Sequence, residues 1–245
     1  MSIRRPSGGL LHAADFYAGP HGALTRTLLV ERLRRMLPPL GARRVLGLGF
    51  ASPYLDQLDC DPLRTVSGRP DNPLTRITAQ YAGSAMECAI DETALPFDDL
   101  SIDLVLAVHA VELMRDPRES LRAIWKVLAD DGFLVLVLPN RTGLWAHGDM
   151  TPFGHGAPYS AWQIERTLKQ SMFRAERLDG ALAVPPVALH LGRRTARAGD
   201  RAMGILGRRF AGVHVVVARK DVYAAMPLAP EGAVGRLKRR ILELA

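Results

Sequence analysis

The stretch that decides the fold is Arg43–Leu55, which reads RRVLGLGFASPYL. A short apolar run from Val45 to Leu48 leads into a turn that contains Gly49, and Pro53 lies where a helix can begin. A buried strand, a tight turn and a helix start form the geometry that presents backbone N–H groups to a nucleotide. We therefore expect this turn to lie at the centre of an open α/β sheet.

Two further apolar runs predict strands that are buried on both faces. They are Ser101–Val108 (SIDLVLAV) and Phe133–Leu138 (FLVLVL), and such continuous runs are typical of central parallel strands. Between them, Pro117–Ala129 is predicted to be a helix, because its apolar residues recur on one face and Pro117 is tolerated in a first turn. A strand, a helix and a strand with short connections imply a right-handed parallel crossover.

The other expected elements follow from periodicity and turn signals. Ser160 is expected to cap its helix, with Gln163 completing a capping box. The expected helices are Gly22–Pro38, Pro53–Leu58, Ser160–Met172, much of Val187–Leu206, and a basic helix or tail at Gly232–Ala245. The expected strands are one near Leu63–Ser67, then Ser84–Ile90, Arg174–Val184 and Gly212–Arg219.

Composition favours one domain of ordinary globular character, with 245 residues, 48% of them hydrophobic and 23% charged. We predict a single domain with an N-terminal helical extension (1–40), a core (41–184), and a basic helix, last strand and tail (185–245). The chain lacks an apolar run of membrane-span length and a signal-peptide core, so we expect a cytoplasmic protein without a membrane. Two isolated cysteines, Cys60 and Cys88, argue against disulfides and a zinc site.

Charge is concentrated towards the C-terminal end. The net charge is +7, yet residues from His190 to Ala245 carry twelve Lys or Arg and four Asp or Glu, a local +8 that leaves the rest near −1. Such a region suits an acidic partner protein, a nucleic acid or a phosphorylated ligand, and the alternative is a solvated face rich in arginine. Because aromatic residues do not interleave the basic ones, nucleic acid is the least favoured partner.

The most specific motif is Asp91–Glu112, which reads DETALPFDDLSIDLVLAVHAVE. An acid stands four residues before Leu-Pro-Phe, and an Ile-Asp-Leu-Val strand is followed by His and Glu. With these residues the chain resembles class I S-adenosylmethionine (SAM)-dependent methyltransferases of the type 11 kind, over roughly Arg43–Asn140. The resemblance implies a Rossmann-like α/β fold, with a mostly parallel seven-stranded sheet, helices on both faces and one antiparallel strand at Gly212–Arg219.

The resemblance also implies SAM as the cofactor. It assigns the adenine amino group to Asp91 and backbone contacts to Glu92, and it places His109 under the methionine moiety. This assignment is chemically reasonable, because an exocyclic amine at the carboxyl edge of the sheet needs an acceptor.

The first motif departs from the pattern of that family, which runs acid-x-Gly-x-Gly-x-Gly. Gly47 takes the place of the acid, Gly49 is retained, and Ala51 and Pro53 replace the later glycines. Ala51 and Pro53 are expected to add atoms where backbone and cofactor nearly touch, and Thr65–Arg69 offers no acid for the ribose. Two or three lost charged hydrogen bonds, at about 1.5–3 kcal/mol each, amount to a factor of ~10²–10⁶ in affinity.

The same turn also approaches a dinucleotide fingerprint. Gly47-x-Gly49-x-x-Ser52 is close to G-x-G-x-x-G, but the acid that this fingerprint needs about twenty residues further on is missing. A nicotinamide cofactor is therefore disfavoured.

The loop Arg141–Tyr159 opens at the carboxyl edge of the sheet, where ligands bind in such folds. It contributes five candidate substrate or lid residues: Arg141, His147, Asp149, His155 and Tyr159. One interpretation is a histidine that faces the substrate as a base or binding group, and the other is a rigid lid packed on the core. The loop lacks the helical H-x₃-H spacing of a metal site, so no metal is expected.

These observations leave two functions open. One is a SAM-dependent methyltransferase of a small-molecule or protein acceptor, which can act mainly by holding acceptor and donor in line. The other is a catalytically degenerate methyltransferase-like protein that regulates a partner through protein–protein contacts, with its basic C-terminal region as the contact surface. The PFGHGAPYS loop resembles that of chains associated with glyoxalase II-type hydrolases, which the resemblance implies as the partner. Phe50, Pro53 or Tyr54 filling the space over Gly49 would favour this alternative.

Overall fold

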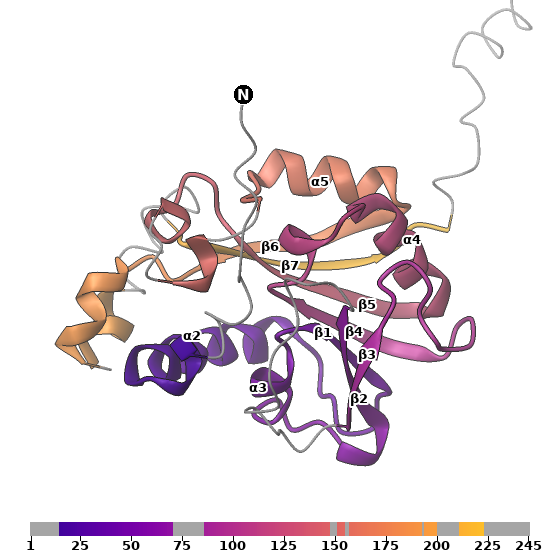
Figure 1. Ribbon diagram of the computed structural model, residues 1–245, viewed down its shortest axis with the longest axis horizontal. Coiled ribbons are helices and arrows are strands. Elements are labelled where there is room, and N and C mark those ends of the chain that lie inside the picture. Colours follow the sequence, from indigo (N-terminus) through magenta and orange to yellow (C-terminus); the bar gives the residue numbers. More distant parts are fainter. Residues whose placement is uncertain are drawn as a thin grey trace, which may run out of the picture.

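The fold is built on one seven-stranded sheet in the order β3-β2-β1-β4-β5-β7-β6 (Figure 1). The computed structural model describes residues 15–70, 86–147, 151–154, 157–192, 194–199 and 211–222. The strands are β1 (Val45–Gly49), β2 (Thr65–Pro70), β3 (Met86–Ile90), β4 (Ile102–Val108), β5 (Leu128–Pro139), β6 (Phe173–Ala181) and β7 (Val213–Lys220).

The sheet is mostly parallel. β1 pairs in parallel with β2 on one side and with β4 on the other, and the parallel pairing continues to β3 and to β5. β7 runs antiparallel to both β5 and β6. The predicted fold class, a mostly parallel seven-stranded sheet with an antiparallel strand near Gly212–Arg219, is therefore confirmed.

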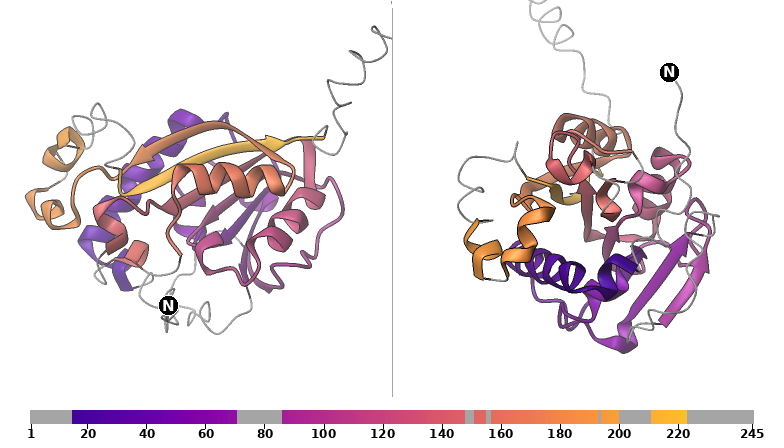
Figure 2. Two further views of the ribbon diagram at one scale, coloured as in Figure 1. Left: turned by 90° about the horizontal axis from the view of Figure 1, so that it is seen from above. Right: turned by 60° about the vertical axis from the view of Figure 1, so that its left-hand side comes forward.

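Helices cover both faces of the sheet (Figure 2). On one face, α2 (Pro20–Met36) and α3 (Ser52–Leu55) pack on the alternate side chains Leu104, Leu106 and Val108 of β4. On the other face, α4 (Pro117–Val127) and α5 (Ala161–Gln170) pack on side chains such as Val105. The described chain also forms short 3₁₀ helices: η1 (Pro62–Arg64), η2 (Val111–Leu113), η3 (Leu144–His147), η4 (Pro152–Gly154) and η5 (Pro186–Leu191).

Several element boundaries differ from the sequence prediction: β5 begins at Leu128 and not at Phe133, α3 ends at Leu55 and not at Leu58, and β6 ends at Ala181 and not at Val184. Two further differences have a local cause. The second strand begins at Thr65 and continues to Pro70, because Asp61 accepts from the backbone N–H of Leu63 and holds the preceding residues in η1. Helix α4 ends at Val127, two residues before the predicted end, because Leu128 is already paired with Ile102 of β4.

The helix predicted after the long loop has its expected cap. Ser160 accepts from the backbone N–H of Gln163 at 3.3 Å, and the Gln163 side chain accepts from the N–H of Ser160 at 2.9 Å. The predicted helix at Val187–Leu206 is present as η5 and a helical segment at 194–199, and its remainder lies outside the described residues. The predicted helix or tail at Gly232–Ala245 also lies outside them. None of the described helices has the length and apolar character that crossing a membrane requires.

Candidate functional site

The turn after β1 is closed by contacts that require glycine at position 49. Gly49 has φ +74°, and an added Cβ would lie 2.5 Å from the carbonyl oxygen of Val108 at the end of β4. The next residue, Phe50, donates its backbone N–H to the same oxygen at 2.7 Å. The retained glycine therefore allows the ends of β1 and β4 to approach each other closely.

The place of the missing acid is filled by apolar side chains. An added Cβ at Gly47 would lie 2.7 Å from Leu55 Cδ1 and 2.8 Å from Ala51 Cβ. Ala51 is fully buried, and its methyl group occupies room that a carboxylate at position 47 would need. The effect of Ala51 on a bound cofactor stays a prediction.

Aromatic rings gather above this turn. The ring of Tyr17 stacks on Phe50, with centroids 5.0 Å apart and planes at 20°, and it meets Tyr54 edge-on at 5.8 Å. Phe153, from the long loop, packs on His109 with centroids 4.4 Å apart. We call Tyr17, Phe50, Tyr54 and Phe153 the aromatic cluster, and all four are buried. Pro53 is buried beside it in α3.

A buried hydrogen-bond chain passes through this cluster. Glu112 Oε1 lies 3.2 Å from His109 Nδ1, His109 Nε2 lies 3.1 Å from the Tyr17 hydroxyl, and the Tyr54 hydroxyl donates to that of Tyr17 at 2.5 Å. With an ionised Glu112 and a neutral His109, Nδ1 carries the proton and Nε2 accepts from Tyr17. The chain thus presents a histidine lone pair at the carboxyl end of β4.

Three features mark this hydrogen-bond chain as unusual. His109 has φ +48°, a left-handed conformation that is rare outside glycine. Glu112 Oε2 is buried and has no hydrogen-bond partner among the described residues. Burial, followed by the neighbouring Tyr54, raises the pKa of Tyr17 well above its usual value. Burial and then the charge of Glu112 also raise the pKa of Tyr159.

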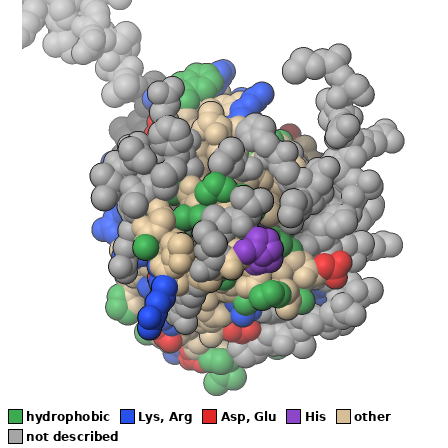
Figure 3. Space-filling model, turned by 90° about the vertical axis from the view of Figure 1, so that its left-hand side faces the viewer, with side chains coloured by type: hydrophobic (Ala, Val, Ile, Leu, Met, Phe, Trp, Pro, Cys, Tyr) green, Lys and Arg blue, Asp and Glu red, His purple; other side chains and the backbone are tan. Residues whose placement is uncertain are grey.

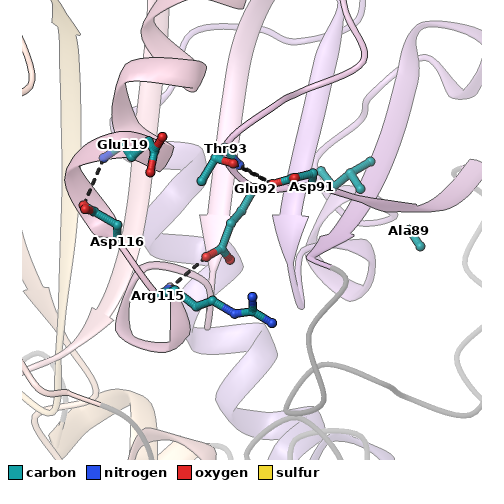
Figure 4. A pocket seen from close by; sticks show the side chains of 8 residues that line it. Ala89, Asp91, Glu92, Thr93, Arg115, Asp116 and Glu119 are labelled. Atoms are coloured by element: carbon teal, nitrogen blue, oxygen red, sulfur yellow. Dashed lines mark hydrogen bonds between the residues drawn. The ribbon is translucent and has the colours of Figure 1, made fainter.

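The motif residues at the end of β3 lie beside a pocket at the carboxyl edge (Figure 4). Asp91 is exposed, and its Oδ1 accepts from both the N–H and the hydroxyl of Thr93 at 2.8 Å, which lowers the pKa of the carboxyl group. Glu92 Oε1 accepts from the N–H of Arg115 at 2.8 Å. The pocket, of about 450 Å³, is lined by Ala89, Ile90, Asp91, Glu92, Thr93, Arg115, Asp116 and Glu119.

The end of β2 carries a polar cluster that the sequence did not suggest. Ser52 Oγ donates to Glu87 Oε1 on β3 at 2.6 Å, and Glu87 Oε2 pairs with Arg69 at 3.1 Å. The hydroxyl oxygens of Ser67 on β2 and Ser52 lie 2.8 Å apart. Because the single Ser52 proton is directed to Glu87, Ser67 is the donor in this second bond. The strand itself offers no acid for a ribose, as the sequence indicated, and Glu87 of the neighbouring strand pairs with Arg69 of β2.

Part of the long loop after β5 packs into the core, and part of it lies at the carboxyl edge of the sheet. Trp145 and Phe153 are buried, and the N–H of Ala157 donates to the carbonyl oxygen of Glu112 at 3.1 Å. The exposed Arg141 donates its N–H to the carbonyl oxygen of Tyr159 at 3.0 Å. His147 ends η3, whereas Asp149 and His155 lie outside the described residues. The structure therefore brings the loop to His109 through Phe153 and to Glu112 through Ala157.

Sequence reasoning missed Tyr17 and treated Glu112 only as part of a motif. A His and a Glu at i and i+3 next to a strand end gave a signal for their pairing. Nothing local indicated Tyr17, which reaches His109 from 92 residues away.

Comparison with known proteins supports the same family. Residues 48–136 match the family model described as methyltransferase domain. Over 117 residues the chain is 29% identical to an uncharacterized protein, YafS, of Escherichia coli strain K12, an alignment that covers 48% of this chain and 44% of that protein. The match thus spans less than half of the length of this curated relative.

Two solved structures share the fold over most of the chain. A SAM-dependent methyltransferase from Thermotoga maritima, described as a possible histamine N-methyltransferase, has a TM-score of 0.62 at 14% identity and covers 84% of this chain and 94% of its own. A chain of the complex between the Haloferax volcanii Trm112 methyltransferase activator and a methyltransferase has a TM-score of 0.56 at 17% identity, with coverages of 89% and 99%. Over residues 48–136 the sequence matches the methyltransferase domain, and over most of the chain the fold is that of these methyltransferase structures.

Proposed function

We propose that the chain binds SAM at the carboxyl edge of the sheet and acts as a SAM-dependent methyltransferase. The observation that carries this proposal is Asp91, an exposed carboxylate at the end of β3 whose pKa is lowered by hydrogen bonds from Thr93. A carboxylate that stays ionised is a pure acceptor, which suits the exocyclic amine of adenine. When bound, SAM supplies an activated methyl group.

The residues fit the two halves of this cofactor unequally. Asp91 and Glu92 line the pocket to which we assign the adenine, and Gly49 keeps the tight turn. Gly47 offers no carboxylate to the methionine end, and Ala51 and Leu55 fill the room for one. We therefore expect binding to be weaker than in a relative with the acid, by the ~1.5–3 kcal/mol that one charged hydrogen bond contributes.

His109 is the group we propose to take a proton from the methyl acceptor. Glu112 fixes the ring through Nδ1, so that Nε2 is directed to the hydroxyl of Tyr17. An acceptor hydroxyl or amine that displaces this hydroxyl meets a base oriented by a buried carboxylate, which is the arrangement that general-base catalysis needs. Tyr17 thus occupies the position that we assign to the acceptor.

Isothermal titration with SAM and with S-adenosylhomocysteine tests the proposal. We expect micromolar to submillimolar binding, and a loss of about tenfold to a hundredfold in the variant Asp91→Ala. The matched control is Asp98→Ala, because Asp98 is an exposed acid of the same loop that uses its backbone oxygen to bind Ser101. Absence of binding at millimolar SAM, or equal affinity in both variants, would overturn the proposal.

A second candidate is a methyltransferase-like protein that regulates a partner without transferring a methyl group. The aromatic cluster favours it, because Phe50 and Tyr54 are buried over the turn and Tyr17 covers them. The partner to test is a glyoxalase II-type hydrolase, which the loop resemblance implies. Size-exclusion chromatography of the purified pair, together with the titration above, separates the two functions: a stable complex without SAM binding supports the second.

A further inference from the structure

Two histidines from distant parts of the chain meet at the surface. His21 lies in the first turn of α2, and His190 lies in η5, 169 residues further on. Their ring nitrogens, Nε2 of His21 and Nδ1 of His190, are 3.1 Å apart. In Figures 1 and 2 the orange segment that contains η5 lies beside the indigo α2, and Figure 3 shows histidine side chains at the surface of this side of the molecule.

The two rings meet edge to face, with centroids 4.3 Å apart and planes at 85°. One ring N–H is directed to the nitrogen of the other ring. A metal ion bound by both rings would replace the proton between these two nitrogens.

The spacing matches that of two ligands of one metal ion. Imidazole nitrogens bind Zn²⁺ at about 2.0–2.1 Å, which places two of them roughly 2.9–3.4 Å apart for angles between square and tetrahedral. The observed 3.1 Å lies inside this range. Neutral imidazole is also a preferred ligand of Zn²⁺, Cu²⁺ and Ni²⁺.

We propose that His21 and His190 bind a divalent transition-metal ion, with water in the remaining positions. Within the described ranges no third His, Cys, Asp or Glu joins the pair as a metal-binding group, so the ion is exchangeable and bound more weakly than in a four-ligand structural site. The proposal is independent of SAM binding, because the pair lies at the junction of α2 and η5 and not among the residues assigned to the cofactor.

Bound metal would strengthen a junction that already has one ionic contact. Arg197, in the helical segment after η5, pairs with Glu31 of α2. A metal at the histidine pair adds a second link between the same two segments, near the other end of α2. The expected consequence is a fold that is more stable when metal is present, since a ligand that binds only the folded state shifts unfolding by mass action.

Titration of the untagged full-length protein with Cu²⁺, Ni²⁺ and Zn²⁺ at pH 7.5 tests this site. We expect the affinity to be greatest for Cu²⁺. The electron paramagnetic resonance spectrum of the Cu²⁺ form should show hyperfine coupling to two nitrogens, and to one in each single variant.

The variants are His21→Ala and His190→Ala, with His147→Ala as the control that leaves the pair intact. Each of the first two should lower Cu²⁺ affinity at least tenfold and abolish the metal-induced rise in melting temperature, while the control keeps both. His21→Gln and His190→Gln serve if an alanine variant folds poorly by circular dichroism. Equal affinity in the wild type and the double variant, or no binding at millimolar metal, would overturn the proposal.

Discussion

The hydroxyl of Tyr17 is hydrogen-bonded to Nε2 of His109 at 3.1 Å, across 92 residues of sequence. This bond joins the segment before α2 to the carboxyl end of β4, the strand at the middle of the sheet. Both ring nitrogens of His109 therefore have a hydrogen-bond partner, because Nδ1 is bonded to Glu112. A histidine with φ +48° and two buried partners is held in a defined orientation.

Removing the Tyr17 hydroxyl should destabilise the protein. In Tyr17→Phe, His109 Nε2 and the Tyr54 hydroxyl both lose a buried partner, and we expect a loss of about 1–3 kcal/mol in the free energy of unfolding. Urea unfolding measures it. Tyr159→Phe is the control, since its hydroxyl is not part of the hydrogen-bond chain, and equal losses in the two variants would contradict this role of Tyr17.

Stability should fall at alkaline pH because of the same residue. Burial raises the pKa of Tyr17 in the folded protein, whereas an unfolded tyrosine loses its proton near pH 10. The stabilising contribution is therefore complete below about pH 10 and is lost as the pH rises towards the folded-state pKa. Urea unfolding at pH 8, 10 and 11 should show a smaller decline in Tyr17→Phe, and an unchanged decline would argue against the assignment.

Replacing Gly47 by the acid of the family motif should destabilise the protein unless a neighbouring side chain is made smaller. Gly47→Asp places a Cβ within 2.8 Å of the side chains of Leu55 and Ala51, and overpacking costs about 1–3 kcal/mol. The double variant Gly47→Asp with Ala51→Gly should recover part of this loss and bind SAM more tightly than the wild type. Thermal unfolding and calorimetry check both statements. Better stability in the single variant than in the double one would refute the account of the missing acid.

A methyl group at position 49 should be far more costly than one at another left-handed glycine. In Gly49→Ala, the positive φ alone costs about 1 kcal/mol of stability. The added Cβ would also lie 2.5 Å from the carbonyl oxygen of Val108. Gly192 has φ +87°, and no atom of the described residues lies within 4 Å of an added Cβ, so Gly192→Ala carries only the cost of the positive φ. Similar losses of stability in the two variants would show that the approach of β1 and β4 is looser than described.

Much of the sheet could be predicted because the local sequence of its strands is sufficient to recognise them. The uninterrupted apolar runs of β4 and β5 are recognisable by composition alone, since both faces of each strand are covered by helices. The cap of α5 was equally local, as Ser160 and Gln163 are three residues apart. The limits of β2 were less predictable, because Leu63 is apolar yet 95% exposed in η1.

The site was predictable only where its members are neighbours in sequence. Asp91 and Glu92 form one motif with the strand that follows, so their common edge could be inferred. Tyr17, Glu87 and His190 reach their partners through the tertiary fold, over separations that no local pattern reveals. The direction of the Ala51 methyl group likewise depends on the packing of Leu55 against Gly47.

The place of β7 sets a constraint on how the chain is made. β7 is the last described strand in sequence, yet it lies between β5 and β6. As the chain leaves the ribosome, β6 emerges first and has no place to pair until Lys220 has followed it. Until then the growing protein exposes the edge of β5, which is the kind of surface that aggregates and that chaperones shield. The sheet is therefore completed late in synthesis, when β7 takes its place between β5 and β6.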